Sequence, residues 1–139
     1  MRIFHRHLWW VLLVAALAIA LLLPRLNQRQ QVNAVDCPDI VTGCVVGDAK
    51  LRVRFDRQPS PLQKFRIAVD APAARQIHAR FSMRDMEMGL NRYRLIPDGN
   101  GHWQAEVMLP VCVQGRNDWL LQLEVDGKSY LLPFTSEGH

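Results

Sequence analysis

The sequence predicts an all-β domain of about seven antiparallel strands, preceded by one N-terminal transmembrane helix. Three observations support this prediction. An uncharged apolar run lies near the start of the chain, short segments of alternating apolar and polar residues follow, and turn-forming residues separate those segments. The chain has 139 residues, of which 49% are hydrophobic and 22% are charged. These values exclude low-complexity disorder and a multi-domain enzyme, and they leave room for one small domain.

The apolar run extends from Leu8 to Leu23 and has arginines on both sides. As a helix its 16 residues would span roughly 24 Å, somewhat less than the ~30 Å hydrocarbon core, and flanking residues can extend it. Arg2 and Arg6 favour a cytoplasmic N-terminus. We therefore expect a single-pass protein of the bacterial inner membrane, with its C-terminal domain in the periplasm. A cleaved secretory signal is the alternative interpretation.

The chain is expected to divide into an anchor at residues 1–24, a linker with a cysteine-containing loop at 25–49, and a periplasmic β-sandwich at 50–139. Four of the 17 basic residues lie in the first 31 positions, where there is no acidic residue. This leaves 13 basic and 13 acidic residues in the rest of the chain. Because a nucleic-acid surface needs an excess of basic residues, the balance argues against a nucleic-acid partner.

The predicted strands are the alternating runs of the C-terminal part. They cover residues 51–55, 65–69, 77–81, 93–95, 103–107, 119–125 and 130–134. Asp126-Gly127 is suited to a two-residue hairpin between the last two runs. Seven short strands in about 90 residues favour an immunoglobulin-like antiparallel sandwich, with a barrel as the alternative. Trp103 and Trp119 are expected in its core or at the edge of the core, because large aromatic residues dominate small interiors.

Three cysteines follow the apolar run, and in an oxidising compartment two of them are expected to form a disulfide. We favour Cys37 with Cys44, because Pro38 and Gly43 between them favour a loop that turns back on itself. The rival pair is Cys44 with Cys112. The remaining cysteine would be a buried thiol or a soft metal ligand.

Three of the five methionines, Met83, Met86 and Met88, fall within six residues. Thioether sulfur is a soft, uncharged ligand that suits Cu(I), so the cluster predicts a copper site. Met83 shares a face with the other two only if Arg84-Asp85 forms a bulge or turn. Further candidate ligands are His78, His102 and Cys112. The alternative is that these methionines are flexible filler in a core or at a contact surface.

The segment F-x-M-x-x-M-x-M-G-x-N-x-Y at residues 81–93 is followed by G-x-W at 101–103, L-P-x-C at 109–112 and G-R-x-x-W at 115–119. In this order the motifs resemble the FixH/YtkA-like group of small membrane-anchored periplasmic proteins, over roughly residues 50–134. The resemblance implies an immunoglobulin-like domain, and a role in assembling haem-copper respiratory oxidases or in handling periplasmic copper. It also implies metal binding by Met83, Met86 and Met88. The sequence lacks the group's usual Met-Pro before the glycine and has three cysteines.

Catalytic signatures are absent from the sequence: it has no G-x-S-x-G, H-E-x-x-H, P-loop or G-x-G-x-x-G motif. We therefore expect an accessory protein rather than an enzyme. The first hypothesis is that it assists the assembly or copper loading of a membrane complex, such as a respiratory oxidase, or works with a copper-delivery protein. The alternatives are a metal-free interaction module, in which the methionines form an adaptable contact surface, and a small subunit of a larger membrane complex.

Overall fold

The computed structural model describes residues 9–20, 32–47, 51–86, 89, 91–112 and 114–137. The chain divides into two compact units, Met1–Gln31 and Val32–His139. Within the first unit, residues 9–20 form a helix whose side chains are all exposed. Among the described residues, no helix combines the length and apolarity needed to cross a membrane. Both ends of the run from Leu8 to Leu23 lie outside those residues.

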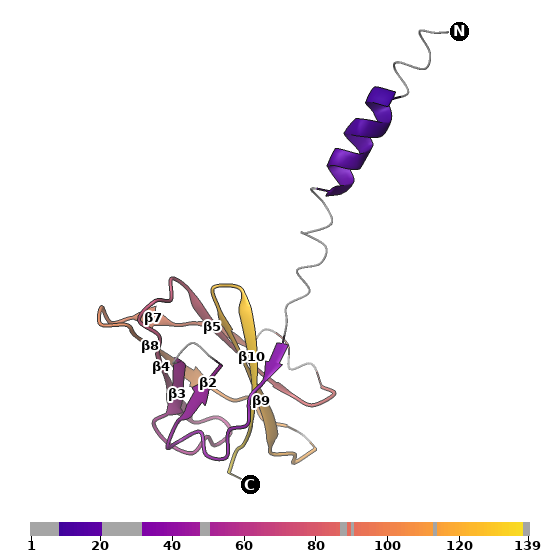
Figure 1. The fold of residues 1–139 in the computed structure, drawn as a ribbon. Helices are drawn as coiled ribbons and strands as arrows, with labels where there is room; N and C mark the ends of the chain where they lie inside the picture. Colours follow the sequence, from indigo (N-terminus) through magenta and orange to yellow (C-terminus); the bar gives the residue numbers. More distant parts are fainter. Residues whose placement is uncertain are drawn as a thin grey trace. The chain divides into compact units, whose positions relative to one another are not determined.

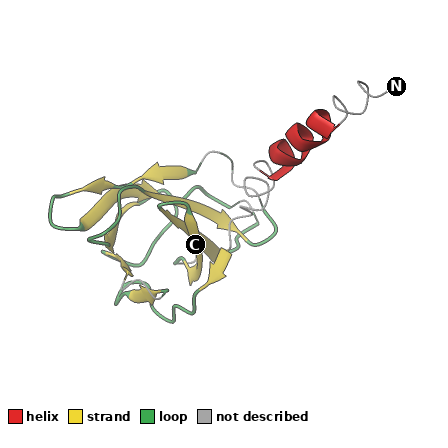
Figure 2. Cartoon of the chain, turned by 45° about the horizontal axis from the view of Figure 1, so that its top comes forward, coloured by secondary structure: helices red, strands yellow, loops and turns green. Residues whose placement is uncertain are grey.

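The second unit contains two five-stranded sheets (Figure 1). Sheet I has the order β1 (Val32–Ala34), β10 (Lys128–Thr135), β9 (Asp118–Val125), β5 (Ile77–Met83) and β6 (Arg92–Arg94). Sheet II has the order β2 (Cys44–Val46), β3 (Leu51–Phe55), β4 (Lys64–Asp70), β8 (His102–Met108) and β7 (Ile96–Pro97). Among these strands only β1 and β10 pair in parallel. The prediction of a mainly β domain with antiparallel sheets is confirmed, and Figure 2 shows strands and loops throughout this unit.

The core lies between the two sheets and is built from the alternating residues that the sequence pattern indicates. In β5 and β9 every second side chain is buried, and the residues between them are partly exposed. The ring of Phe55 in sheet II lies 5.2 Å from that of Phe134 in sheet I, so aromatic contacts join the sheets. Trp103 and Trp119 are buried as predicted. Their indole nitrogens donate to the Ala71 carbonyl and the Ser136 hydroxyl, each at 3.2 Å.

Each of the seven predicted runs overlaps a strand, and three further strands were not predicted. These three, β1, β2 and β7, have only two or three residues each, and none of them belongs to an alternating run that the sequence analysis identified. The predicted hairpin turn is present, because Val125 pairs with Lys128 and both Asp126 and Gly127 have positive φ. Alternation therefore located the long strands and β6, while the other three short strands were recognised only from their pairing in the sheets.

Cys37 and Cys44 form a disulfide, as predicted. Cys37 follows β1 of sheet I, and Cys44 begins β2 of sheet II. The bond therefore fixes the segment in which the chain passes from one sheet to the other. Cys112 is a free, buried thiol.

Candidate functional site

The strands run between two ends of the sandwich, and a different set of the predicted metal-binding residues lies near each end. The histidine end, as we call it, consists of the connections at residues 71–76, 98–101 and 126–127. The methionine end consists of the connections at residues 56–63, 84–85, 109–112 and 114–117. The strand registers define these ends, since Asp70 pairs with His102 at one and Lys64 pairs with Met108 at the other.

Met83 and Met86 form a turn at the methionine end. The Met86 amide donates to the Met83 carbonyl at 3.2 Å, and the two residues form an isolated antiparallel bridge. Asp85 has a φ of 61°, so Arg84-Asp85 makes the turn that places bridged side chains on one face. Met83 is only 2% exposed, and Met86 is half-buried against the core. Met88 lies outside the described residues.

The two predicted histidine ligands lie at the other end. His78 precedes Met83 by five residues along β5, which corresponds to about 17 Å of extended chain. His102 belongs to the opposite sheet, and its Nδ1 lies 2.5 Å from Oδ1 of Asp70. The structure thus does not bring His78 or His102 together with the methionine turn.

Cys112 is at the methionine end, in the connection after β8. The Gly115 amide donates to the Cys112 carbonyl at 3.0 Å, and Nε of the next residue, Arg116, donates to Asp118 Oδ1 at 2.8 Å. This hydrogen bond is the main cause that raises the pKa of Arg116 and lowers the pKa of Asp118. Asp85 and Cys112 add smaller raising effects to the pKa of Arg116, which indicates that they lie near the guanidinium. Within the described part of the chain, no three His, Cys, Asp or Glu side chains are grouped to hold a metal.

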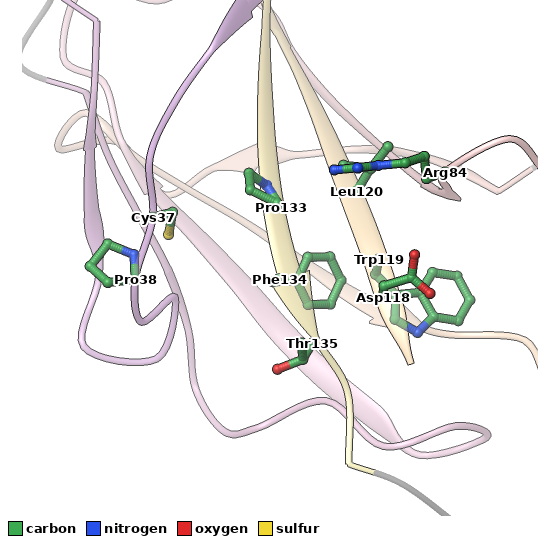
Figure 3. A pocket seen from close by; sticks show the side chains of 9 residues that line it. All are labelled: Cys37, Pro38, Arg84, Asp118, Trp119, Leu120, Pro133, Phe134 and Thr135. Carbon is green, nitrogen blue, oxygen red and sulfur yellow. The ribbon is translucent and has the colours of Figure 1, made fainter. Parts of the chain in front are cut away.

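A pocket of about 310 Å³ lies beside the methionine turn. Its lining residues are Cys37, Pro38, Arg84, Asp118, Trp119, Leu120, Pro133, Phe134 and Thr135. Figure 3 shows Cys37 and Pro38 on one side of β10, with Arg84 and Leu120 on the other. No sequence pattern indicates this pocket, because the pocket depends on the segment after β1 lying beside β10. Its walls are mainly apolar, and Arg84 and Asp118 supply opposite charges.

Three apolar side chains are exposed at the same end and form what we call the apolar rim. Leu62, Met108 and Val111 are 62%, 40% and 42% exposed, respectively. They are held close together because the Leu62 amide donates to the carbonyl of Leu109, which follows Met108, at 3.0 Å. Leu62 also has a φ of 61°, a conformation that costs a leucine roughly 1–2 kcal/mol. An exposed apolar group held in a costly conformation is typical of a contact surface.

The geometry therefore gathers Met83, Met86, Cys112, the pocket and the apolar rim at one end of the domain. Of the predicted site residues, only the two histidines are placed elsewhere among the described residues. Searches against protein-family models, characterised proteins and solved structures each found nothing that matches this chain.

Proposed function

We propose that this chain is a tethered interaction module, whose sandwich binds a membrane protein complex through the methionine end. The single observation that carries the proposal is the exposure of the three apolar side chains of the rim, at the same end of the domain as a pocket of about 310 Å³. Flexible methionine side chains adapt to irregular partner surfaces, and Met86 and Met108 provide them here. The predicted partner class is an inner-membrane complex such as a respiratory oxidase, or a copper-delivery protein, as the resemblance implies.

The strand order supports an immunoglobulin-like arrangement for the module. Taking β3 to β10 in chain order as strands A, B, C, C′, D, E, F and G, sheet II contains the order A-B-E-D. Sheet I contains G-F-C-C′ in the same notation, with β1 added beside G. This order matches that of the two sheets in an immunoglobulin-type sandwich, which supports the proposed arrangement. Such domains commonly serve as binding modules, and no catalytic role is proposed for this one.

The proposed location is the periplasmic side of the bacterial inner membrane. The uncharged run of 16 residues and its flanking arginines support an anchor, and residues 9–20 of the first unit are helical. The disulfide between Cys37 and Cys44 supports an oxidising compartment, because cytosolic thiols are kept reduced.

The proposal is tested by purifying the full chain from its native membranes in mild detergent and measuring the stoichiometry of the proteins that remain bound. Leu62→Asp places a charge in the apolar rim, and aspartate tolerates the positive φ at this position. Val45→Asp is the matched control, since Val45 is 61% exposed, is a residue of β2 and lies outside the methionine end. We expect Leu62→Asp to release the partner and Val45→Asp to retain it. Retention by both variants, or release by both, contradicts the proposal.

One observation favours copper binding as a second candidate function. The bridge between Met83 and Met86 puts two thioethers on one face, at the end that also contains Cys112. Because Met83 is buried and both histidines are distant, Met86 and Met88 would have to carry most of the binding. Titration of the full chain with Cu(I) tests this. Micromolar or tighter binding that disappears in Met86→Ala/Met88→Ala, but persists in Met108→Ala, supports copper; unchanged binding in the double variant rejects this site.

A further inference from the structure

The strand β6 forms one edge of sheet I, and no described strand pairs with the outer side of its backbone. The Phe81 amide donates to the Asn91 carbonyl at 3.1 Å, and the Leu95 amide donates to the Ile77 carbonyl at 3.0 Å. In an antiparallel ladder the residues that bond to the neighbouring strand alternate with residues that face away. Arg92 and Arg94 therefore direct their N–H and C=O groups away from β5. These groups form a short template on which another extended chain can pair.

The side chains at this edge are basic and face one another. Arg80 of β5 is directly opposite Arg92, and His78 is directly opposite Arg94. Like charges in cross-strand positions such as Arg80 and Arg92 are destabilising, and this non-hydrogen-bonded pair brings its side chains especially close. We call these four residues the basic edge. An anionic group placed between these side chains would reduce their repulsion and stabilise the folded domain.

Part of this positive charge is compensated within the domain. Arg92 Nη2 lies 3.0 Å from Glu124 Oε2 on β9, and Arg80 has an interaction of its own. Arg94 is exposed and has no ion-pair partner among the described residues. The positive charge that a ligand can contact is therefore mainly that of Arg94, with a smaller contribution from Arg92, which is paired with Glu124. Both side chains lie beside the outward-facing backbone groups of the same two residues.

We propose that β6 receives an extended acidic segment of a partner protein, which adds to sheet I as a further strand. β6 has three residues, so the added strand is about equally short. Side chains alternate between faces along a strand, so carboxylates two residues apart reach Arg92 and Arg94 together. The inference rests on the proposed function only in requiring a protein partner, and the surface it uses is distinct from the methionine end.

The test uses the full chain in non-ionic detergent and a fluorescent peptide of alternating Glu and Val residues as the probe. We expect the peptide to bind at low salt, and a version with Lys in place of Glu not to bind. Arg94→Glu should weaken binding at least about tenfold, as expected when a charge-assisted hydrogen bond is lost. Arg54→Glu is the matched control, because Arg54 is an exposed arginine on β3 of the other sheet. It should leave the affinity unchanged.

A second probe separates strand addition from simple charge attraction. The same peptide with its alternate backbone nitrogens methylated keeps its carboxylates but cannot complete a β-ladder. Strand addition predicts weaker binding of this peptide, and equal binding overturns it. Failure of the first peptide to bind, or equal weakening by Arg94→Glu and Arg54→Glu, also overturns the proposal and leaves the arginines as protection of an exposed edge. Leu62→Asp should bind the peptide normally, so failure at the methionine end is recognised separately.

Discussion

The two ends of the sandwich are closed in different ways. At the histidine end the Asp126 carboxylate accepts hydrogen bonds from the amides of Arg75 and Gln76, at 3.1 Å and 2.9 Å for Oδ1. The Ala71 amide there donates to Gly101 at 2.7 Å. The methionine end instead exposes the apolar rim and encloses the pocket. The turns of the histidine end are thus joined by hydrogen bonds to Asp126 and Gly101, while the methionine end groups three exposed apolar side chains that a partner can cover.

This comparison predicts that the same substitution has different effects at the two ends, with the largest at Gly101. A Cβ at Gly101, where φ is +78°, would lie 2.6 Å from the Cα of Pro72. Gly115 at the methionine end has a φ of +66° and open space around it. We expect Gly101→Ala to lower the free energy of unfolding by roughly 3 kcal/mol or more, and Gly115→Ala by about 1 kcal/mol.

Urea unfolding of both variants, followed by circular dichroism, gives the two values. Gly115→Ala serves as the control for backbone strain without a steric clash. Equal losses of stability would show that the histidine end is no more tightly packed than the methionine end, which would contradict the comparison.

The sequence pattern predicted most of the strands, but it did not predict which side chains lie at each end of the sandwich. Alternation in β5 already puts Met83 on the same face as Phe81, so its burial could have been predicted from the residue pattern. The separation of His102 from the methionines could not, because it depends on β8 pairing with β4 rather than with β5. The residue types that could bind a metal can thus be predicted from the sequence. Whether those residues lie close together can be determined only from the order of strands in the sheets.

The pocket and the basic edge show the same limit in another form. Arg92 and Arg94 are two residues apart in the sequence, with Tyr93 between them. Only the pairing of β6 with β5 places them opposite Arg80 and His78. The pocket depends on the parallel pairing of β1 with β10, two strands at opposite ends of the domain in sequence. Local patterns cannot report contacts between such distant segments.

An intermediate effect is expected from the disulfide, which borders the pocket at the methionine end. Replacing Cys37 and Cys44 with serine releases a loop with a sequence separation of 7, and the loop-closure model gives a loss of about 2 kcal/mol. The measurement is chemical unfolding of the double variant, with Cys112→Ser as the control that leaves the bond intact. If the double variant loses no more stability than the control, the segment after β1 is held by its other contacts.

The smallest effect is expected from acid, through two exposed ion pairs near the methionine end. The hydrogen bond and charge of Lys64 lower the pKa of Glu106, and Arg116 lowers the pKa of Asp118. A carboxylate with a lowered pKa in the folded state binds protons less readily than in the unfolded chain. The stabilisation that such a carboxylate gives to the folded state is therefore complete above its ordinary pKa, which is 4.5 for Glu106 and 3.8 for Asp118. It is lost as the pH falls through the lowered pKa of the folded state.

Because both pairs are exposed, solvent and salt weaken them, and the loss should be smaller than that from removing the disulfide. Thermal unfolding between pH 7 and pH 3 measures it. We expect Glu106→Gln/Asp118→Asn to show a shallower decline of Tm with acid than the wild type at low salt, and the two curves to converge at high salt. A decline of equal steepness at low salt would assign the acid sensitivity to other carboxylates.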